Sequence, residues 1–426
     1  MKDEELVKEF LGNSCELING QRYSLGSEGF LMINFDFYNP TRVIFGKETE
    51  NNVGEICKGY GYKSVLVVYG GGSAKKSGLL DRIFTSLKES GVSYCEIGGV
   101  VPNPRVQLVR EAVALAKENS VDFILGVGGG SVLDTAKAAA MALANDCDPW
   151  DIYSKKIAPV TALPVGAVLT IAAAGSETSN SSVITEDETG LKRGYGHDCI
   201  RPVFAIMNPE LTYTLPAYQT ASGVVDIMMH TMERYFTPTL DVELTDRLSE
   251  GLLVTVMENA IKLVKNPKDY SARAEIMWAG SISHNGLMGT GRVTDFASHQ
   301  IEHELSGMFD VAHGAGLAAI WGSWARYVYK ENVGRFVQFA VRVMGCEMDF
   351  QCPENTALRG IEKIEDFFRS INMPTSLYEL GIKEISEEQI EEMAYKCTFK
   401  DTRVIGGFKT LKKEDIMAIY NMAKGI

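Results

Sequence analysis

Hydrophobic residues follow two different patterns along the chain. Between about Asn34 and Pro209, short continuous apolar runs alternate with segments in which apolar positions recur every three or four residues. The first pattern predicts buried strands, and the second predicts helices that cover them. We expect strands over 64–71, 93–100 and 121–130, and helices over 74–91 and 104–120. Because this alternation is typical of a parallel sheet flanked by helices, the first half should be a doubly wound α/β domain.

The pattern changes at the segment NPELTYTLP, which contains Pro209 and Pro216. Beyond it the strand-like runs nearly disappear, and long amphipathic helices follow, for example over 357–371 and 384–397. We therefore divide the chain into an extension at 1–31, an α/β domain at 32–214 and an all-helical domain at 215–426. A cleft between the two domains would be the natural place for a ligand.

The first 31 residues resemble neither domain in pattern. Leu6, Phe10 and Leu11 fall on one side of a short amphipathic helix candidate, and a polar, glycine-containing stretch follows it as far as Met32. A helix of this length is marginal in isolation and becomes ordered only where its apolar side finds a surface. The extension is therefore either a mobile segment, or an upstream start, before a domain that begins near Met32, or a helix that docks to a partner or shell. We expect it to be dispensable for chemistry and any function that it has to be in association.

Composition and charge exclude several classes of protein. The chain has 426 residues, of which 45% are hydrophobic and 23% charged, as in ordinary globular proteins. Its net charge of −13 argues against binding to nucleic acid or to anionic lipid. The eight cysteines form no Cys-x-x-Cys pair, which indicates reduced thiols. With no long apolar run and an acidic N-terminal segment, we expect a cytoplasmic protein without a membrane partner.

One stretch of the second half concentrates side chains that can bind a metal. Asp226 and His230 are four residues apart in a helical, Met-rich run, so both leave the same face one turn apart. His299 and His303 repeat this spacing, and His313 follows in a turn bounded by glycine. Carboxylate and imidazole together suit Fe²⁺ or Zn²⁺ better than Ca²⁺ or Mg²⁺. The spacing leaves open whether His303 or His313 completes the ligand set.

Two glycine-rich loops follow predicted strands and open helices. The stronger candidate is Gly128-Gly129-Gly130-Ser131, with Asp134 three residues after the serine like a capping pair. Glycines let the backbone approach a pyrophosphate, and the free amides of a helix start favour its charge, so this loop predicts a dinucleotide site. It lacks the G-x-G-x-x-G fingerprint, and a plain tight turn would have the same sequence.

The other loop is Gly70-Gly71-Gly72-Ser73, at the end of the first strand of the domain. A site that selects NAD commonly places an acid where it can bind the ribose 2′-hydroxyl. No acid occurs between positions 65 and 80, and Ser73 and nearby lysines offer donors to a 2′-phosphate. We therefore expect NADP(H) to be preferred over NAD(H).

With these residues placed, a set of separated segments can be compared with known families. The segments are, in order, NPTRVIFGK, VVPNP, GGGSVLD, AGSE, NPELTYTLP, SGVVDIMMHTMERY, NGLMGTG and SHQIEHELSG to HGAGLA. The chain resembles the iron-containing alcohol dehydrogenase family, and within it the NADPH-dependent butanol dehydrogenases and aldehyde reductases. The resemblance runs from about Asn34 to the C-terminus, and residues 1–31 have no counterpart in the usual family pattern.

The resemblance implies a metal held by one aspartate and three histidines. Carried over residue by residue, it selects Asp226, His230, His299 and His313 as ligands. His303 then matches the non-ligand histidine that lines the substrate site of the family.

The resemblance also implies a set of cofactor-binding residues. These are Gly70, Gly71, Gly72, Ser73, Asn103, Gly129, Gly130, Ser131, Asp134, Ser176 and Lys192. Ala174 departs from the family, which often has a threonine at this position whose hydroxyl can contact the cofactor, so the affinity or preference for the cofactor could shift.

The implied activity is hydride transfer between NAD(P)H and a small aliphatic aldehyde or primary alcohol such as butanal or butanol. A divalent metal would polarise the aldehyde oxygen or stabilise the alkoxide, and His303 would pass the proton between alkoxide and solvent. We expect a homodimer. Two alternatives are a lyase of the dehydroquinate synthase type, which would need a basic pocket, and a non-catalytic scaffold component docked through residues 1–31.

Overall fold

A six-stranded, wholly parallel sheet forms the centre of the first half of the molecule. The computed structural model describes residues 15–18, 21–24 and 31–425. In the sheet the strands follow the order β3-β10-β7-β6-β4-β5. They are β3 (Arg42–Phe45), β4 (Ser64–Gly70), β5 (Ser93–Val100), β6 (Phe123–Gly128), β7 (Val165–Leu169) and β10 (Phe204–Met207). The predicted parallel α/β fold is therefore confirmed.

Helices cover both faces of this sheet because side chains alternate between its two faces. Val65 and Val67 of β4 pack against α2 (Val53–Gly59) and α4 (Leu79–Glu89), whereas Leu66 and Val68 pack against α5 (Val106–Glu118) and α6 (Gly130–Asn145). The single helix expected over 74–91 is wrong in one respect. Gly78 adopts a left-handed backbone with φ of 72° and separates α3 (Ser73–Lys76) from α4.

The sheet order places both glycine loops at one point. From β4 the chain moves outward to β5 and then returns to the other side of β4 as β6, so the direction of winding reverses between β4 and β6. These two strands are neighbours, with Tyr69 paired to Val127, and their carboxyl ends lead into the loops at Gly70 and Gly128. Ligands of open α/β sheets bind at such a switch point.

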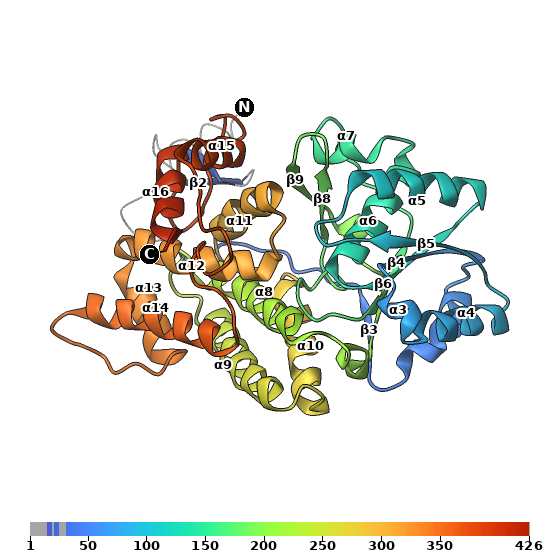
Figure 1. The fold of residues 1–426 in the computed structure, drawn as a ribbon, viewed down its shortest axis with the longest axis horizontal. Coiled ribbons are helices and arrows are strands. Elements are labelled where there is room, and N and C mark those ends of the chain that lie inside the picture. The colour runs from blue at the N-terminus through green and yellow to red at the C-terminus, as the bar shows by residue number, and fades with distance from the viewer. Residues whose placement is uncertain (1–14, 19–20, 25–30, 426) are drawn as a thin grey trace, which may run out of the picture.

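The second half of the molecule is a bundle of helices around its own core, beside the half that contains the sheet (Figure 1). Its long helices are α8 (Ala217–Tyr235), α9 (Glu243–Lys265), α10 (Tyr270–His284), α11 (Ala297–Phe309), α12 (His313–Val328), α13 (Val333–Arg342), α14 (Pro353–Ser370), α15 (Glu387–Cys397) and α16 (Lys413–Ala423). The helices expected over 357–371 and 384–397 correspond to α14 and α15. The predicted boundary at residue 215 falls between β10 and α8.

Smaller elements connect the two halves or lie on their edges. The hairpin of β8 (Ser181–Glu186) and β9 (Leu191–Gly196) is antiparallel, and β9 contacts α11. The short helices are α7 (Pro149–Tyr153), η1 (Thr49–Asn52), η2 (Asp198–Ile200), η3 (Pro209–Thr212), η4 (Leu287–Gly289) and η5 (Tyr329–Glu331). Across the part of the chain that the structure describes, no helix combines the length and the apolar character needed to cross a membrane.

In the N-terminal extension the structure describes only an antiparallel pair of strands, β1 (Cys15–Ile18) and β2 (Gln21–Ser24). The amphipathic helix predicted from Leu6, Phe10 and Leu11 lies outside the described residues. Directly after the extension, the chain contacts the helical half. The backbone N–H of Ile33 donates to the carbonyl of Gly291 at 3.0 Å.

Candidate active site

Helix α8 presents an acid and a histidine on the face that meets α11 and α12. Asp226 and His230 stand one turn apart, and His230 Nδ1 lies 3.2 Å from Asp226 Oδ1. Both side chains are buried, in a helix that is almost entirely enclosed from Ala221 onward. The i, i+4 spacing seen in the sequence therefore places two potential ligands side by side inside the molecule.

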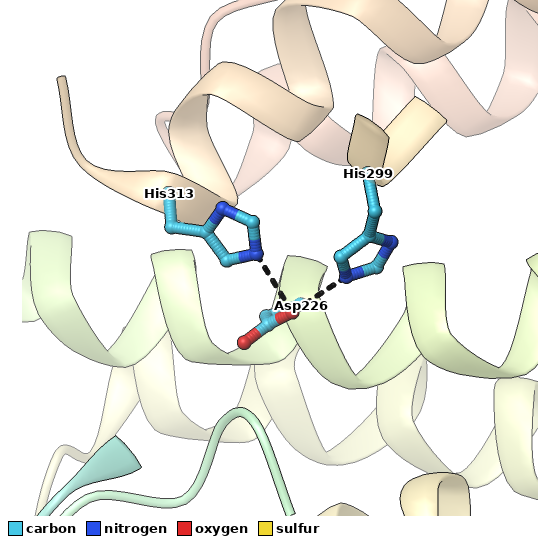
Figure 2. Close-up of side chains that lie close together, drawn as sticks. All are labelled: Asp226, His299 and His313. Carbon is cyan, nitrogen blue, oxygen red and sulfur yellow. Dashed lines mark ion pairs between the residues drawn. The ribbon is translucent and has the colours of Figure 1, made fainter. Parts of the chain in front are cut away.

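Two further histidines reach the same oxygen atom from other helices. His299 Nε2, from α11, lies 3.5 Å from Asp226 Oδ1, and His313 Nε2, from the first turn of α12, lies 3.8 Å from it (Figure 2). Oxygen and nitrogen atoms of Asp226, His299 and His313 all lie within 4.8 Å of one another. Four predicted ligands, counting His230, thus converge on one point.

Three potential metal-ligand atoms of this cluster lack hydrogen-bond partners. Within the described residues, Asp226 Oδ1, His230 Nδ1 and His299 Nε2 are buried and accept or donate no hydrogen bond. Buried polar atoms are normally paired, so a set of orphaned carboxylate and imidazole atoms that face one another needs an explanation. One carboxylate and three imidazoles are a donor set that a divalent transition metal prefers. The residues present therefore fit a metal of this kind.

Two buried glutamates determine which ring nitrogen of His299 and of His313 faces Asp226. Glu233 of α8 hydrogen-bonds His299 Nδ1, and Glu302 of α11 hydrogen-bonds His313 Nδ1. With Nδ1 engaged in each ring, Nε2 remains to face Asp226. Sequence analysis missed both glutamates, although each stands three residues after a histidine, at 230 and 299.

Burial and charge act in opposite directions on the groups of the cluster. Burial lowers the pKa of His299, but the carboxylates of Glu233 and Asp226 outweigh burial and raise this pKa to about 9. Burial raises the pKa of Glu302, but His313 and Lys192 outweigh it and lower this pKa to about 2. For His230, burial and the neighbouring histidines both lower the pKa. The two carboxylates therefore favour a proton on His299, and binding of a metal ion by this ring would require its release.

His303 lies beside the cluster. Its ring centre is 6.4 Å from that of His299 and 5.6 Å from that of His313, and its side chain is half-buried. Within the described residues, the ion pairs of Asp226 join it to His230, His299 and His313. The ligand atoms of His303 lie within 4.8 Å of those of Glu302 and His313. Of the two alternatives that spacing left open, the geometry groups His313 with Asp226.

His284, at the end of α10, is a neighbour that sequence analysis did not single out. Its ring centre lies 4.1 Å from that of His230. Arg234 Nη2 lies 3.0 Å from His284 Nδ1, and Ser181 Oγ lies 3.0 Å from its Nε2. Because arginine only donates, Nδ1 must accept and Nε2 must carry the proton. The only sequence signal was a histidine directly before NGLMGTG.

The two glycine loops line one cavity of about 620 Å³ at the switch point of the sheet. The predicted cofactor residues on its wall are Gly70, Gly71, Ser73, Gly129, Gly130 and Ser131. Gly72 caps α3 with φ of 122°, a conformation that favours glycine. Helix α6 begins at Gly130, so its free N–H groups start beside this cavity, where an anionic phosphate would be favoured.

Other predicted cofactor residues make contacts within the protein. Asn103, in a left-handed backbone conformation, donates from Nδ2 to Asp310 Oδ1 at 2.9 Å. Ser176 donates to Asp134 Oδ1 at 2.8 Å. Lys192 Nζ lies 3.7 Å from Glu302 Oε2. In this structure these side chains brace the walls around the cavity and the histidine cluster.

The buried side chain of Lys137, a residue of α6, connects this helix to the segment around the start of β8. Lys137 Nζ donates to Ser176 Oγ at 3.0 Å and to the carbonyl oxygens of Ser179 and Ser181 at 3.0 and 2.9 Å. Burial lowers the pKa of Lys137 to about 8, although Asp134 opposes this. The lysine therefore ties α6 to the segment that leads into β8.

Models of known protein families match both halves of the chain. The model described as "Iron-containing alcohol dehydrogenase" matches residues 40–209, and the model described as "Fe-containing alcohol dehydrogenase family, C-terminal" matches residues 220–424. These spans correspond to the half with the sheet and to the helical half.

Individual proteins are similar over most of their length. "Probable NADH-dependent butanol dehydrogenase 1" of Bacillus subtilis (strain 168) is 43% identical over 388 residues, which are 91% of this chain and 99% of that protein. "NADPH-dependent aldehyde reductase YqhD" of Escherichia coli (strain K12) is 38% identical, over 82% of this chain and 90% of that protein. The crystal structure of NADH-dependent butanol dehydrogenase A from Thermotoga maritima has a TM-score of 0.89 at 38% identity, over 93% of this chain and all of that one (100%).

The contribution of Lys137 to stability can be tested by removing its buried ammonium group. Lys137→Met should lower the free energy of unfolding by about 3 kcal/mol, because it leaves Ser176 Oγ and the carbonyl oxygens of Ser179 and Ser181 without the buried donor that they share. The measurement is the urea midpoint of the metal-free chain. Lys117→Met is the control, since Lys117 pairs with Asp146 on the surface and its loss should barely move the midpoint. Equal effects of the two substitutions would contradict the role given to Lys137.

Proposed function

Because this chain belongs to the iron-containing alcohol dehydrogenase family, we propose that it transfers a hydride between NAD(P)H and small aliphatic aldehydes or primary alcohols, with butanal and butanol as the representative pair. The protein is an oxidoreductase of the alcohol dehydrogenase and aldehyde reductase type. Its family implies NAD(P)H and a divalent metal. The names of the Bacillus subtilis and Thermotoga maritima proteins support butanol as a substrate.

The observation that carries the proposal is the convergence of imidazole nitrogens on Asp226 Oδ1. Asp226, His230, His299 and His313 are the proposed ligands of one divalent metal, Fe²⁺ or Zn²⁺. Such a metal would act as a Lewis acid on the aldehyde oxygen or on the alkoxide.

The remaining roles belong to the protein itself. The loops at Gly70–Ser73 and Gly129–Ser131 would hold the dinucleotide in the cavity at the switch point, and the start of α6 would face its pyrophosphate. His303 is proposed to line the substrate side and to carry a proton between the substrate oxygen and solvent. Its place one turn from His299 and beside His313 supports this role.

A preference for NADPH over NADH is proposed from the first glycine loop. Gly70, Gly71 and Ser73 line the cavity and bring no carboxylate to it. Glu48, Glu50 and Glu210 line other parts of the same cavity. Arg82 pairs with Glu50 at 2.9 Å, and Lys47 pairs with Glu210 at 2.8 Å. Related proteins are named for either cofactor, NADH in Bacillus subtilis and NADPH in Escherichia coli, so the loop alone carries this preference.

Association into a homodimer is proposed from the segment where the extension meets the α/β domain. Leu31, Phe35 and Tyr38 expose 68%, 56% and 55% of their surface, which is unusual for three large apolar residues so close in sequence. A second copy of the chain would cover them. The extension at 1–31 is proposed to act in association, with this chain or another partner, and to be dispensable for chemistry.

The metal prediction tests activity and ligand set together. Loaded with Zn²⁺ or Fe²⁺, the chain should consume NADPH when butanal is added, and the metal-free chain should not. His313→Ala should lose bound metal because it removes a proposed ligand, whereas His303→Ala should keep it. Metal analysis of the purified variants checks this, and loss of metal in His303→Ala alone would refute the assignment. A lyase would bind the dinucleotide without net consumption, and a scaffold component would show no turnover.

The cofactor prediction uses a position where a side chain fits. A Cβ at Gly71 would meet no atom within 4 Å. Gly71→Asp should lower the ratio of kcat/KM for NADPH to that for NADH roughly tenfold or more, because the carboxylate repels a 2′-phosphate. Gly71→Asn, of the same size without the charge, is the control and should leave the ratio nearly unchanged. Equal use of both cofactors by the unsubstituted protein would contradict the preference.

The extension prediction compares the full chain with one that begins at Met32. Turnover and metal content should be unchanged, because the metal and glycine-loop residues all lie beyond this point. The oligomer size in solution, measured by light scattering, should change if the extension contributes to association. A large loss of turnover at equal folded concentration would show instead that the extension belongs to the catalytic body.

A further inference from the structure

Two buried glutamates hold two of the proposed ligands in the same manner. Glu233 and Glu302 are both fully enclosed, and each bonds the Nδ1 atom of a histidine. Glu233 also accepts the backbone N–H of His299 at 2.8 Å, so it fixes both the ring and the start of α11. In each case the carboxylate comes from an element other than the one that carries the histidine.

The surroundings of Glu302 are built around its charge. Its Oε1 atom accepts a hydrogen bond from Ser306, and its Oε2 atom lies 3.7 Å from the buried ammonium group of Lys192. On α12, a Cβ at Gly316 would lie only 2.8 Å from Oε1, so the glycine leaves the room that the carboxylate fills. A buried carboxylate is costly unless it is paired and hydrogen-bonded, and here both conditions are met.

Nearby on the same helix, Glu304 provides a contrast. It is also buried, and its Oε1 atom pairs with Arg193 at 2.9 Å. Among the residues that the structure describes, its carboxylate pairs with Arg193 and with no histidine of the cluster. Glu302 and Glu304 therefore share helix, residue type and burial, and differ in whether they touch a proposed ligand.

We propose that Glu233 and Glu302 are positioning residues that act on the metal through His299 and His313. By accepting the Nδ1 proton, each carboxylate leaves the Nε2 lone pair directed at Asp226 and makes the imidazole a stronger donor. Each glutamate contacts Nδ1 of its histidine, whereas Nε2 of the same ring approaches Asp226. This inference rests on the proposed ligand set and extends it by two residues that the sequence comparison did not assign.

The test measures Zn²⁺ affinity of the full chain by competition with a chromophoric chelator. Glu233→Gln and Glu302→Gln should each weaken Zn²⁺ binding roughly 10- to 100-fold, since the neutral amide holds the imidazole less firmly. Glu304→Gln should bind Zn²⁺ within about twofold of the unsubstituted chain, because second-neighbour effects require contact with a ligand. Thermal unfolding of each metal-free variant identifies a general loss of fold.

A second readout needs no metal. In the metal-free chain labelled with ¹⁵N-histidine, the imidazole signals of His299 and His313 should report a proton on Nδ1, and the signal of the bonded histidine should change in the matching Gln variant but not in Glu304→Gln. If the unsubstituted chain binds Zn²⁺ and both Gln variants bind it equally well, the positioning role of the glutamates is overturned and the proposed function is unaffected. If the unsubstituted chain binds no Zn²⁺, the proposed function fails, and the inference fails with it.

Discussion

The arrangement of charged groups between α8, α11 and α12 depends on one buried carboxylate oxygen, Asp226 Oδ1. It has no hydrogen-bond partner within the described residues, and burial of an unpaired carboxylate is costly. Neutral imidazole nitrogens facing it would add repulsion between lone pairs. The cluster therefore needs either protons on its histidines or a cation at its centre. The carboxylates of Glu233 and Asp226, which raise the pKa of His299, favour the first arrangement, and a bound metal ion would provide the second.

The close approach of three helices satisfies this condition, and glycine makes the approach possible. A Cβ at Gly314 would overlap the carbonyl oxygen of Ser222, so any larger residue would push the start of α12 away from α8. His313 is the residue directly before this glycine and reaches Asp226 only because the two helices touch there. The glycines around His313 are therefore a packing requirement of the cluster, beyond their use as a turn signal.

Local periodicity explains how much of this could be predicted from the sequence. Strands and helices followed from apolar spacing, and the Asp226–His230 pair followed from the geometry of one helix. Contacts between distant segments did not follow. Ser176 and Asp134, which bond to each other, are 42 residues apart, so the sequence could not show that they face inward to one another. The partners of Glu233 and Glu302 likewise depend on how the helices cross, which apolar spacing does not define.

The hairpin of β8 and β9 connects the half that contains the proposed dinucleotide cavity with the histidine cluster proposed to bind the metal. It belongs to the half with the sheet, yet Lys192 and Arg193 of β9 pair with Glu302 and Glu304 of α11. Glu302 in turn bonds His313, so the hairpin reaches the histidine cluster through a single intervening residue. Hydride transfer depends steeply on the distance and alignment of the reacting groups. The contact between β9 and α11 is short and buried, and it is therefore well placed to fix the cavity of one half relative to the cluster of the other.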